Sequence, residues 1–225
     1  MNDAVPYESE RRAMIGNQLR RRGIRDERVL EAMFRIPRHE FVAPALVRRA
    51  YDDRPLPIGQ SETISQPYIV AVMTEAAQIQ PGDQILEVGA GSGYQAAILS
   101  WLGAKVLALE RNPDLAEFAR RRLVRLGFEG IQIITGDGTE GYAPAAPYQA
   151  IVVTAASPPQ IPQPLLDQLA EGGRLVIPVG ALDHQELRQV SRHGNEFVTR
   201  TLDQCQFVPL IGKYGWPEMK PLGSS

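Results

Sequence analysis

The chain has 225 residues, 44% of them hydrophobic, and its 24 basic and 26 acidic side chains leave a net charge of -2. This composition predicts one compact unit with a full-sized core, and the balanced charge argues against nucleic acid as a partner. The single cysteine, Cys205, excludes an intrachain disulfide, and the polar N-terminus and lack of long apolar runs predict a cytoplasmic protein with no membrane partner.

The first third of the chain is predicted to be helical. Apolar residues at helical spacing over residues 8–34 indicate two amphipathic helices, interrupted near Gly23, with Asp26 as the N-cap of the second. Residues 51–60 contain two prolines and are typical of irregular or short structure. A further helix is expected over residues 66–78.

From residue 84 onward, short apolar strands alternate with helical segments. The strand Gln84–Val88 precedes a glycine-rich loop and a helical stretch that runs from Tyr94 to Leu102. Such alternation predicts an α/β fold with a doubly wound parallel sheet. Later strands are expected at residues 105–109, 131–135, 150–154 and 174–179, and later helices at 114–126 and 164–170.

The C-terminal part is predicted to form an antiparallel edge of this sheet. Strands are expected at residues 186–190, 196–202 and 206–210, and the polar tail, residues 213–225, is expected to be poorly ordered. The chain therefore divides into an N-terminal helical cover region (1–80), an α/β core (81–212) and the tail (213–225), within one compact unit overall.

The loop after the first core strand carries three glycines, Gly89, Gly91 and Gly93. The first allows a tight turn, the second lets a ligand approach the backbone, and the third lets the next helix pack closely on the strand. The free N–H groups at the start of that helix attract an anion, such as the carboxylate of a methionine moiety. A dinucleotide fingerprint would require glycine at position 94, where this chain has tyrosine, which argues against an NAD-dependent oxidoreductase.

Two acids follow at the ends of the next strands. Glu110 lies about 20 residues beyond the glycine loop, where a carboxylate accepts ribose hydroxyls in this architecture. Asp137, in the sequence Thr135-Gly136-Asp137-Gly138, can accept an adenine amino proton. Three such features at successive strand ends predict a site for a nucleoside-type cofactor.

These residues, together with Arg54–Gln60, the T-I-S-x-P element Thr63–Pro67 and Gly172–Gly180, resemble the protein-L-isoaspartate (D-aspartate) O-methyltransferase family over roughly residues 8–212. The T-I-S-x-P element is more specific than the glycine loop, which Rossmann-like methyltransferases share. The resemblance implies a methyltransferase fold of that type, with S-adenosyl-L-methionine as cofactor, S-adenosyl-L-homocysteine as product and no metal. It also implies methylation of the free α-carboxylate of L-isoaspartyl residues in damaged proteins and peptides, which starts repair through a succinimide. We expect the protein to be a monomer.

The same resemblance assigns roles to individual residues. It makes Ser65 the catalytic residue, on a loop from Thr63 that closes over the cofactor. Tyr68 and Gln149 depart from residues common in the family, but neither departure removes a step of the chemistry. The implied cofactor-binding residues are Thr63, Ile64, Glu87, Gly89, Gly91, Glu110, Asp137 and Gly138, and the implied substrate-binding residues are Ser65, Val208 and Leu210.

The implied reaction needs few side chains. An α-carboxyl group has a pKa of about 3.5, so it is already ionised at neutral pH and requires no general base. We expect Ser65 to donate a hydrogen bond to this carboxylate and not to act as a covalent nucleophile. Ser65 also precedes Pro67 at the start of a predicted helix, a pattern typical of an N-cap, so both roles are open at this point.

Two other functions compete with this interpretation. A methyltransferase acting on nitrogen commonly carries an N-P-P-Y-like element after its fourth strand, where this chain reads Thr154-Ala155-Ala156-Ser157-Pro158. A noncatalytic S-adenosylmethionine-binding regulator is disfavoured because the T-I-S-x-P element is intact. We interpret His39 as structural, and no spacing among the three histidines indicates a metal site.

Overall fold

The computed structural model describes residues 6–218 and has a seven-stranded sheet in the order β5-β4-β3-β6-β7-β8-β9. Strands β3 to β7 pair in parallel, whereas β7–β8 and β8–β9 pair antiparallel. The predicted fold class, with its antiparallel C-terminal edge, is therefore confirmed. The strands are β3 (Gln84–Val88), β4 (Lys105–Glu110), β5 (Gln132–Thr135), β6 (Tyr148–Val153), β7 (Leu169–Ala181), β8 (His184–His193) and β9 (Glu196–Cys205).

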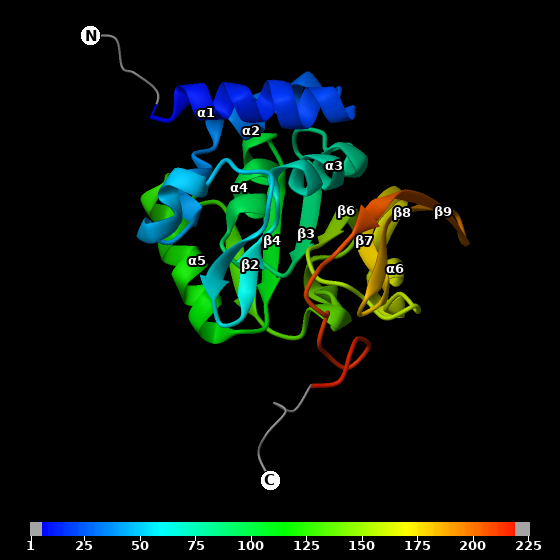
Figure 1. Cartoon of the computed structure of the whole chain (residues 1–225). Helices are drawn as coiled ribbons and strands as arrows, with labels where there is room; N and C mark the ends of the chain where they lie inside the picture. The colour runs from blue at the N-terminus through cyan, green and yellow to red at the C-terminus, as the bar shows by residue number, and fades with distance from the viewer. Residues whose placement is uncertain (1–5, 219–225) are drawn as a thin grey trace.

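Helices cover both faces of the sheet, and the N-terminal helical run crosses the top of the molecule above α2 and α3 (Figure 1). The carboxylate of Asp26 accepts the N–H of Arg28 at 2.8 Å, so this residue caps α2 as predicted. The helical elements are α1 (Glu8–Ala13), η1 (Met14–Leu19), η2 (Arg20–Arg22), α2 (Glu27–Arg35), η3 (Arg38–Phe41), η4 (Pro44–Arg49), α3 (Pro67–Ala77), α4 (Tyr94–Trp101), α5 (Pro113–Arg125), η5 (Gly138–Glu140), η6 (Ala143–Ala145) and α6 (Gln163–Asp167). Within residues 6–218, no helix has the length and apolar character that crossing a bilayer requires.

The core lies on both sides of the sheet, because successive side chains of a strand point to opposite faces. Ile85 packs into the cluster that includes the N-terminal helices, and its neighbour Leu86 packs into a second cluster with α6. Both side chains are fully buried. The adjacent apolar residues Ile85 and Leu86 thus bury this strand on both faces.

The chain reverses direction across the sheet at β3. It moves outward from β3 through β4 to β5, and then returns to place β6 on the other side of β3. In doubly wound sheets, such a reversal opens a crevice at the carboxyl ends of the strands, where ligands bind. The glycine loop that follows β3 therefore lies at the point of the fold most suited to a ligand.

The cover region contains a small hairpin formed by β1 (Leu56–Gly59) and β2 (Glu62–Ile64). This hairpin lies within and just after the stretch expected to be irregular or short. Gln60 and Ser61 both adopt positive φ at its tip, which closes the tight turn. The second strand of the hairpin contains Thr63 and Ile64 and ends three residues before Pro67, where α3 begins.

The C-terminal segment differs from the prediction in two places. The expected strand at residues 206–210 is wrong, because only Pro209 forms an isolated bridge, to Ala156, and β9 ends at Cys205. Residues 213–218, assigned from the sequence to a poorly ordered tail, lie within the described chain, where the N–H of Lys213 donates to Asp137 at 2.7 Å. The rest of that tail lies outside the described residues.

Candidate active site

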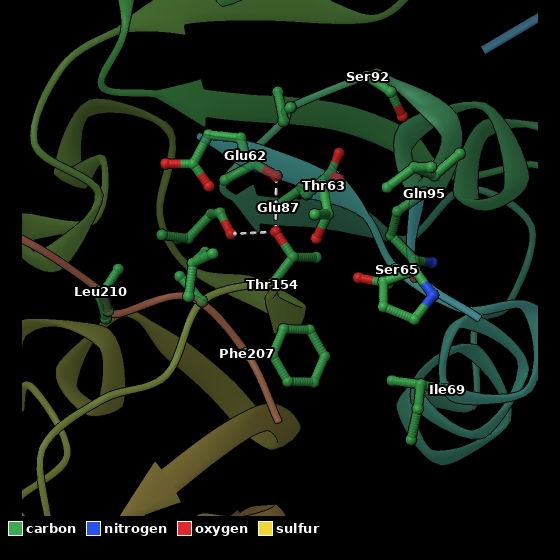
Figure 2. Close-up of a pocket in the computed structure, with 18 of the residues that line it drawn as sticks. Glu62, Thr63, Ser65, Ile69, Glu87, Ser92, Gln95, Thr154, Phe207 and Leu210 are labelled. Carbon is green, nitrogen blue, oxygen red and sulfur yellow. Dashed lines mark hydrogen bonds between the residues drawn. The ribbon is translucent and has the colours of Figure 1, made fainter. Parts of the chain in front are cut away.

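A cavity of about 370 Å³ lies at the carboxyl ends of the central strands, between the glycine loop, the β1–β2 hairpin and the segment around Phe207. Figure 2 shows side chains from these separate elements facing the same space. The cavity is lined by almost all of the predicted site residues, namely Thr63, Ile64, Ser65, Glu87, Gly89, Gly91, Glu110, Gly138, Val208 and Leu210.

The glycine loop has the backbone conformation that its sequence requires. Gly89, Gly91 and Gly93 have φ values of 92°, 51° and 85°, in the left-handed region where glycine carries no steric penalty. A Cβ on Gly89 would lie 2.5 Å from the Oγ1 atom of Thr154. That hydroxyl donates to the carbonyl of Gly89 at 2.6 Å and also contacts the carbonyl of Val88 at 3.0 Å, shown as dashed lines in Figure 2.

Glu110, at the end of β4, is held by the backbone around it. Its two carboxylate oxygens accept the N–H groups of Gly91 and Asn112, both at 2.9 Å. Each oxygen keeps a second lone pair for a ligand. The carboxylate is thus oriented before any ligand binds, which suits the paired hydroxyls of a ribose.

Glu87 is the most unusual acid in the cavity. It is fully buried, and neither of its carboxylate oxygens has a hydrogen-bond partner among the described residues. Burial, together with the nearby charge of Glu110, raises the pKa of Glu87 well above its ordinary value. An unpaired buried carboxylate is costly, so burial favours the protonated form of Glu87.

A third acid, Glu62 on β2, lines the same cavity. Burial and the charge of Glu110 raise the pKa of Glu62 as well. Three carboxylates around one cavity favour a ligand with net positive charge, as expected for a sulfonium that also carries an ammonium group. Within residues 6–218, no three histidine, cysteine or acidic side chains are grouped so that they could hold a metal ion.

Asp137 lies beside the cavity and is not among the residues that line it. One of its oxygens accepts both the N–H and the hydroxyl of Thr139, and the other accepts the N–H of Lys213. Partial burial acts to raise the pKa of Asp137, but these hydrogen bonds lower it overall. In this structure the carboxylate therefore anchors the C-terminal segment, and contact with an adenine stays a prediction.

Ser65 occupies the link between β2 and α3, on the wall of the cavity (Figure 2). It does not cap α3, because the N-cap residue is Gln66 and the N–H of Tyr68 donates instead to the carboxylate of Asp53 at 3.2 Å. The structure therefore excludes the capping role considered for Ser65. Its hydroxyl forms no hydrogen bond with any residue in the described part of the chain, and Ile69 and Phe207 line the cavity near it.

Arg38 holds the backbone of Ser65 in place from beneath the cavity. Its side chain is completely buried and donates to the carbonyls of Ala50 and Ser65, each at 2.7 Å. The guanidinium also lies 4.9 Å from the ring centroid of Tyr94, the first residue of α4. Burial lowers the pKa of Arg38. One buried cation thus joins the cover region, the Ser65 loop and the helix that follows the glycine loop.

Several cavity residues were missed by sequence reasoning. Thr154 could have been found, because it directly follows β6 and so lies at the same edge of the sheet as the glycine loop. Glu62, Ile69 and Phe207 carry no such signal. They reach the cavity only because the hairpin, α3 and the C-terminal segment fold over the sheet.

The fold and the cavity together define a Rossmann-like S-adenosylmethionine-dependent methyltransferase. Comparisons with known proteins place the chain more narrowly. Residues 9–215 match the family model described as protein-L-isoaspartate(D-aspartate) O-methyltransferase. The chain belongs to this family.

Individual relatives can be aligned with this chain over nearly their whole length. The chain is 58% identical to the protein-L-isoaspartate O-methyltransferase of Methanoculleus marisnigri, covering 95% of this chain and 97% of the relative. It is 53% identical to that of Methanoregula boonei, with 96% and 99% covered. A Plasmodium falciparum structure of this type, in complex with S-adenosyl-L-homocysteine, is 27% identical with a TM-score of 0.77, covering 89% of this chain and 98% of that chain.

Proposed function

We propose that this protein transfers a methyl group to the free α-carboxylate of L-isoaspartyl residues in damaged proteins and peptides. The observation that carries this proposal is the position of Ser65, with an unengaged hydroxyl, on the wall of an acidic cavity in a chain of the protein-L-isoaspartate O-methyltransferase family. The backbone nitrogen of the next residue then attacks the methyl ester and expels methanol to form a succinimide, whose hydrolysis returns part of the residues to the normal aspartyl linkage.

The residues of the cavity fit S-adenosyl-L-methionine. Glu110 would hold its ribose, and the unpaired carboxylate of Glu87 would face its positively charged portion. The backbone N–H groups of the glycine loop would receive its carboxylate. When bound, this cofactor supplies a methyl group on a sulfonium sulfur, and loss of that methyl leaves S-adenosyl-L-homocysteine.

The protein's own contribution is then mainly positional. The acceptor carboxylate is ionised at neutral pH, so no side chain must remove a proton from it. The hydroxyl of Ser65 donates a hydrogen bond that aims one carboxylate oxygen, and Phe207 and Ile69 exclude water beside it. The hydrogen bond must be a single, moderate one, because stronger stabilisation of the carboxylate would weaken it as a nucleophile.

The substrate is tested with paired peptides that differ only in an aspartyl or an isoaspartyl linkage, incubated with S-adenosylmethionine labelled in the methyl group. The proposal expects base-labile label on the isoaspartyl peptide alone. Equal labelling of both peptides, or no labelling by protein that binds the cofactor, would overturn it. Peptides with a D-aspartyl residue, run in parallel, extend the test to the second acceptor in the family's description.

Ser65→Ala tests the role of the hydroxyl. Loss of one positioning hydrogen bond is expected to lower kcat by about 10- to 100-fold, with little change in melting temperature because the hydroxyl forms no hydrogen bond within the described chain. Ser100→Ala, on α4 and outside the cavity, is the matched control. A Ser65→Ala variant with the kcat of the Ser100→Ala control would remove Ser65 from the mechanism.

The proposal also includes action as a monomer in the cytoplasm, without nucleic acid. It is supported by the single cysteine and the near-balanced charge of the chain. Sedimentation at several protein concentrations tests the monomer. Activity that does not change on addition of duplex DNA or RNA tests the absence of a nucleic-acid partner.

A further inference from the structure

A second cavity, of about 360 Å³, opens on the surface beside the candidate active site. Its walls come from three elements that are far apart in the sequence, namely the end of η2, one side of α3 and the middle of β9. In Figure 1, α3 lies beneath the N-terminal helical run, and β9 reaches toward it from the opposite side. We refer to this cavity as the side groove.

The side groove adjoins the active-site cavity. Arg22 lines both, and β9 passes from the groove at Leu202 to the active-site cavity at Gln204. Between them the pairing of β9 with β8 contains a bulge that leaves Leu202 without an opposite residue. A bulge bends a strand and redirects its side chains, and bulges are frequent next to active sites.

A clamp of three side chains holds the junction of the two cavities. The guanidinium of Arg22 lies 3.3 Å from the ring centroid of Tyr68, and the hydroxyl of Tyr68 donates to Asp203 at 2.9 Å. Arg22 also pairs with Asp53 at 2.8 Å. The junction is thus built from η2, α3 and β9 together, and its shape does not depend on one flexible side chain.

When the acceptor residue lies within a polypeptide, the chain on both sides of it must leave the active site across the neighbouring surface. An extended chain advances about 3.5 Å per residue, so the residues flanking an acceptor lie within reach of the adjoining surface. The side groove meets the active-site cavity at Arg22, and β9 runs from the groove to Gln204, which lines the same cavity as Ser65. Its partly exposed apolar side chains, Val72 and Leu202, can cover the methylene groups of a flanking side chain.

The charges of the groove favour an acidic flanking residue. The acid on its wall, Glu75, already accepts the N–H groups of Arg25 and Asp26, both at 2.7 Å. By contrast, the exposed guanidinium of Arg200 forms no ion pair or side-chain hydrogen bond within the described chain. A carboxylate supplied by the substrate is the natural partner for this cation.

We propose that the side groove is a substrate subsite that binds a residue flanking the isoaspartyl position and selects an acidic side chain there through Arg200. This inference rests on the proposed function, because it takes an isoaspartyl polypeptide as the substrate. It concerns the choice among such substrates and not the methyl transfer itself.

The test uses isoaspartyl peptides with a single glutamate or lysine placed at each of about four positions on either side of the acceptor, roughly 14 Å of extended chain in each direction. An exposed ion pair changes affinity by up to about fivefold. At each position we compare kcat/KM of the glutamate peptide with that of the lysine peptide. This ratio should exceed one by a few-fold at one or two positions on a single side of the acceptor, and should be close to one at the other positions.

Arg200→Glu should invert that ratio at the same positions only. Arg48→Glu is the control, since it makes the same change in net charge at an exposed residue that lines neither cavity. A flat ratio at every position in the wild-type protein would overturn the subsite, as would an Arg48→Glu variant with the same effect as Arg200→Glu. If no isoaspartyl peptide is methylated at all, the proposed function fails, and the subsite fails with it.

Discussion

Replacing Arg38 by methionine is expected to lower turnover as well as stability. The change removes two hydrogen bonds of 2.7 Å from a charged donor, each worth about 1.5–3 kcal/mol, and leaves the carbonyls of Ala50 and Ser65 unpaired. It also removes a fully buried cation that forms no ion pair within residues 6–218, which returns part of that energy. We therefore expect a net loss in the free energy of unfolding of about 1–3 kcal/mol, or up to roughly 10 °C in melting temperature.

Catalysis should fall as well, because the hydroxyl of Ser65 is positioned only through its backbone. A displacement of about 1 Å at a reacting group can lower the rate by about 100-fold, so a fall in kcat of at least tenfold is expected for Arg38→Met. The KM for the peptide should change less than kcat. Arg38→Lys keeps the charge but can form only some of the hydrogen bonds of Arg38. Its kcat should therefore lie between that of the wild-type protein and that of Arg38→Met.

Arg11 offers a matched control for this prediction. It is also buried, and its guanidinium donates to the carbonyls of Phe34 and Arg35, at 2.9 and 3.1 Å, at the end of α2. Arg11→Met should thus lower the melting temperature without lowering kcat per folded molecule. Steady-state kinetics and thermal melts of both variants make the comparison. If both variants lose stability and neither loses kcat, Arg38 is a structural residue and the reasoning is refuted.

Two further predictions concern the cofactor end of the cavity. Because the pKa of Glu87 is raised in the folded protein, the stability of the ligand-free protein should fall as pH rises from the ordinary carboxyl pKa through that of folded Glu87. Glu87→Gln should reduce this fall in melting temperature with pH and weaken S-adenosylmethionine binding. An unchanged slope with pH would contradict this. Gly89→Ala would place a Cβ 2.5 Å from the Thr154 hydroxyl, whereas Gly127→Ala, at a similarly positive φ of 84°, meets open space. Calorimetry should show S-adenosylhomocysteine binding lost in the first variant and retained in the second, and equal binding by the two would refute the close-approach argument.

Much of the fold follows from local sequence patterns. The apolar residues Ile85, Leu86 and Val88 of Gln84–Val88 are typical of a strand buried on both faces, and the alternation of such strands with helical segments specifies a parallel sheet. The positions of Gly89 and Glu110 at successive strand ends follow from that topology, because parallel strands end at one edge. The cap at Asp26 is equally local, since its partner lies two residues away.

Other features depend on contacts between residues far apart in the chain. The Ser65 pattern resembles a helix cap, but Asp53 takes that role. The chain folds back through the β1–β2 hairpin, so the carboxylate of Asp53 accepts the N–H of Tyr68. Residues 206–210 have strand-like composition, yet the N–H of Phe207 bonds the side chain of Gln185 and the segment crosses to Ala156. Local sequence propensities cannot predict hydrogen-bond partners that lie so far away in the chain.

The sequence by itself determined the sheet, the glycine loop and the family, because these depend on periodicity and on short motifs whose atoms meet within a few residues. Only the tertiary structure decided what surrounds Ser65. It brought Arg38 under the carbonyl of Ser65, left Glu87 unpaired in the cavity, and joined the active site to the side groove at Arg22. Those arrangements require the hairpin, α3 and β9 to meet, and that meeting is set by packing over the whole chain.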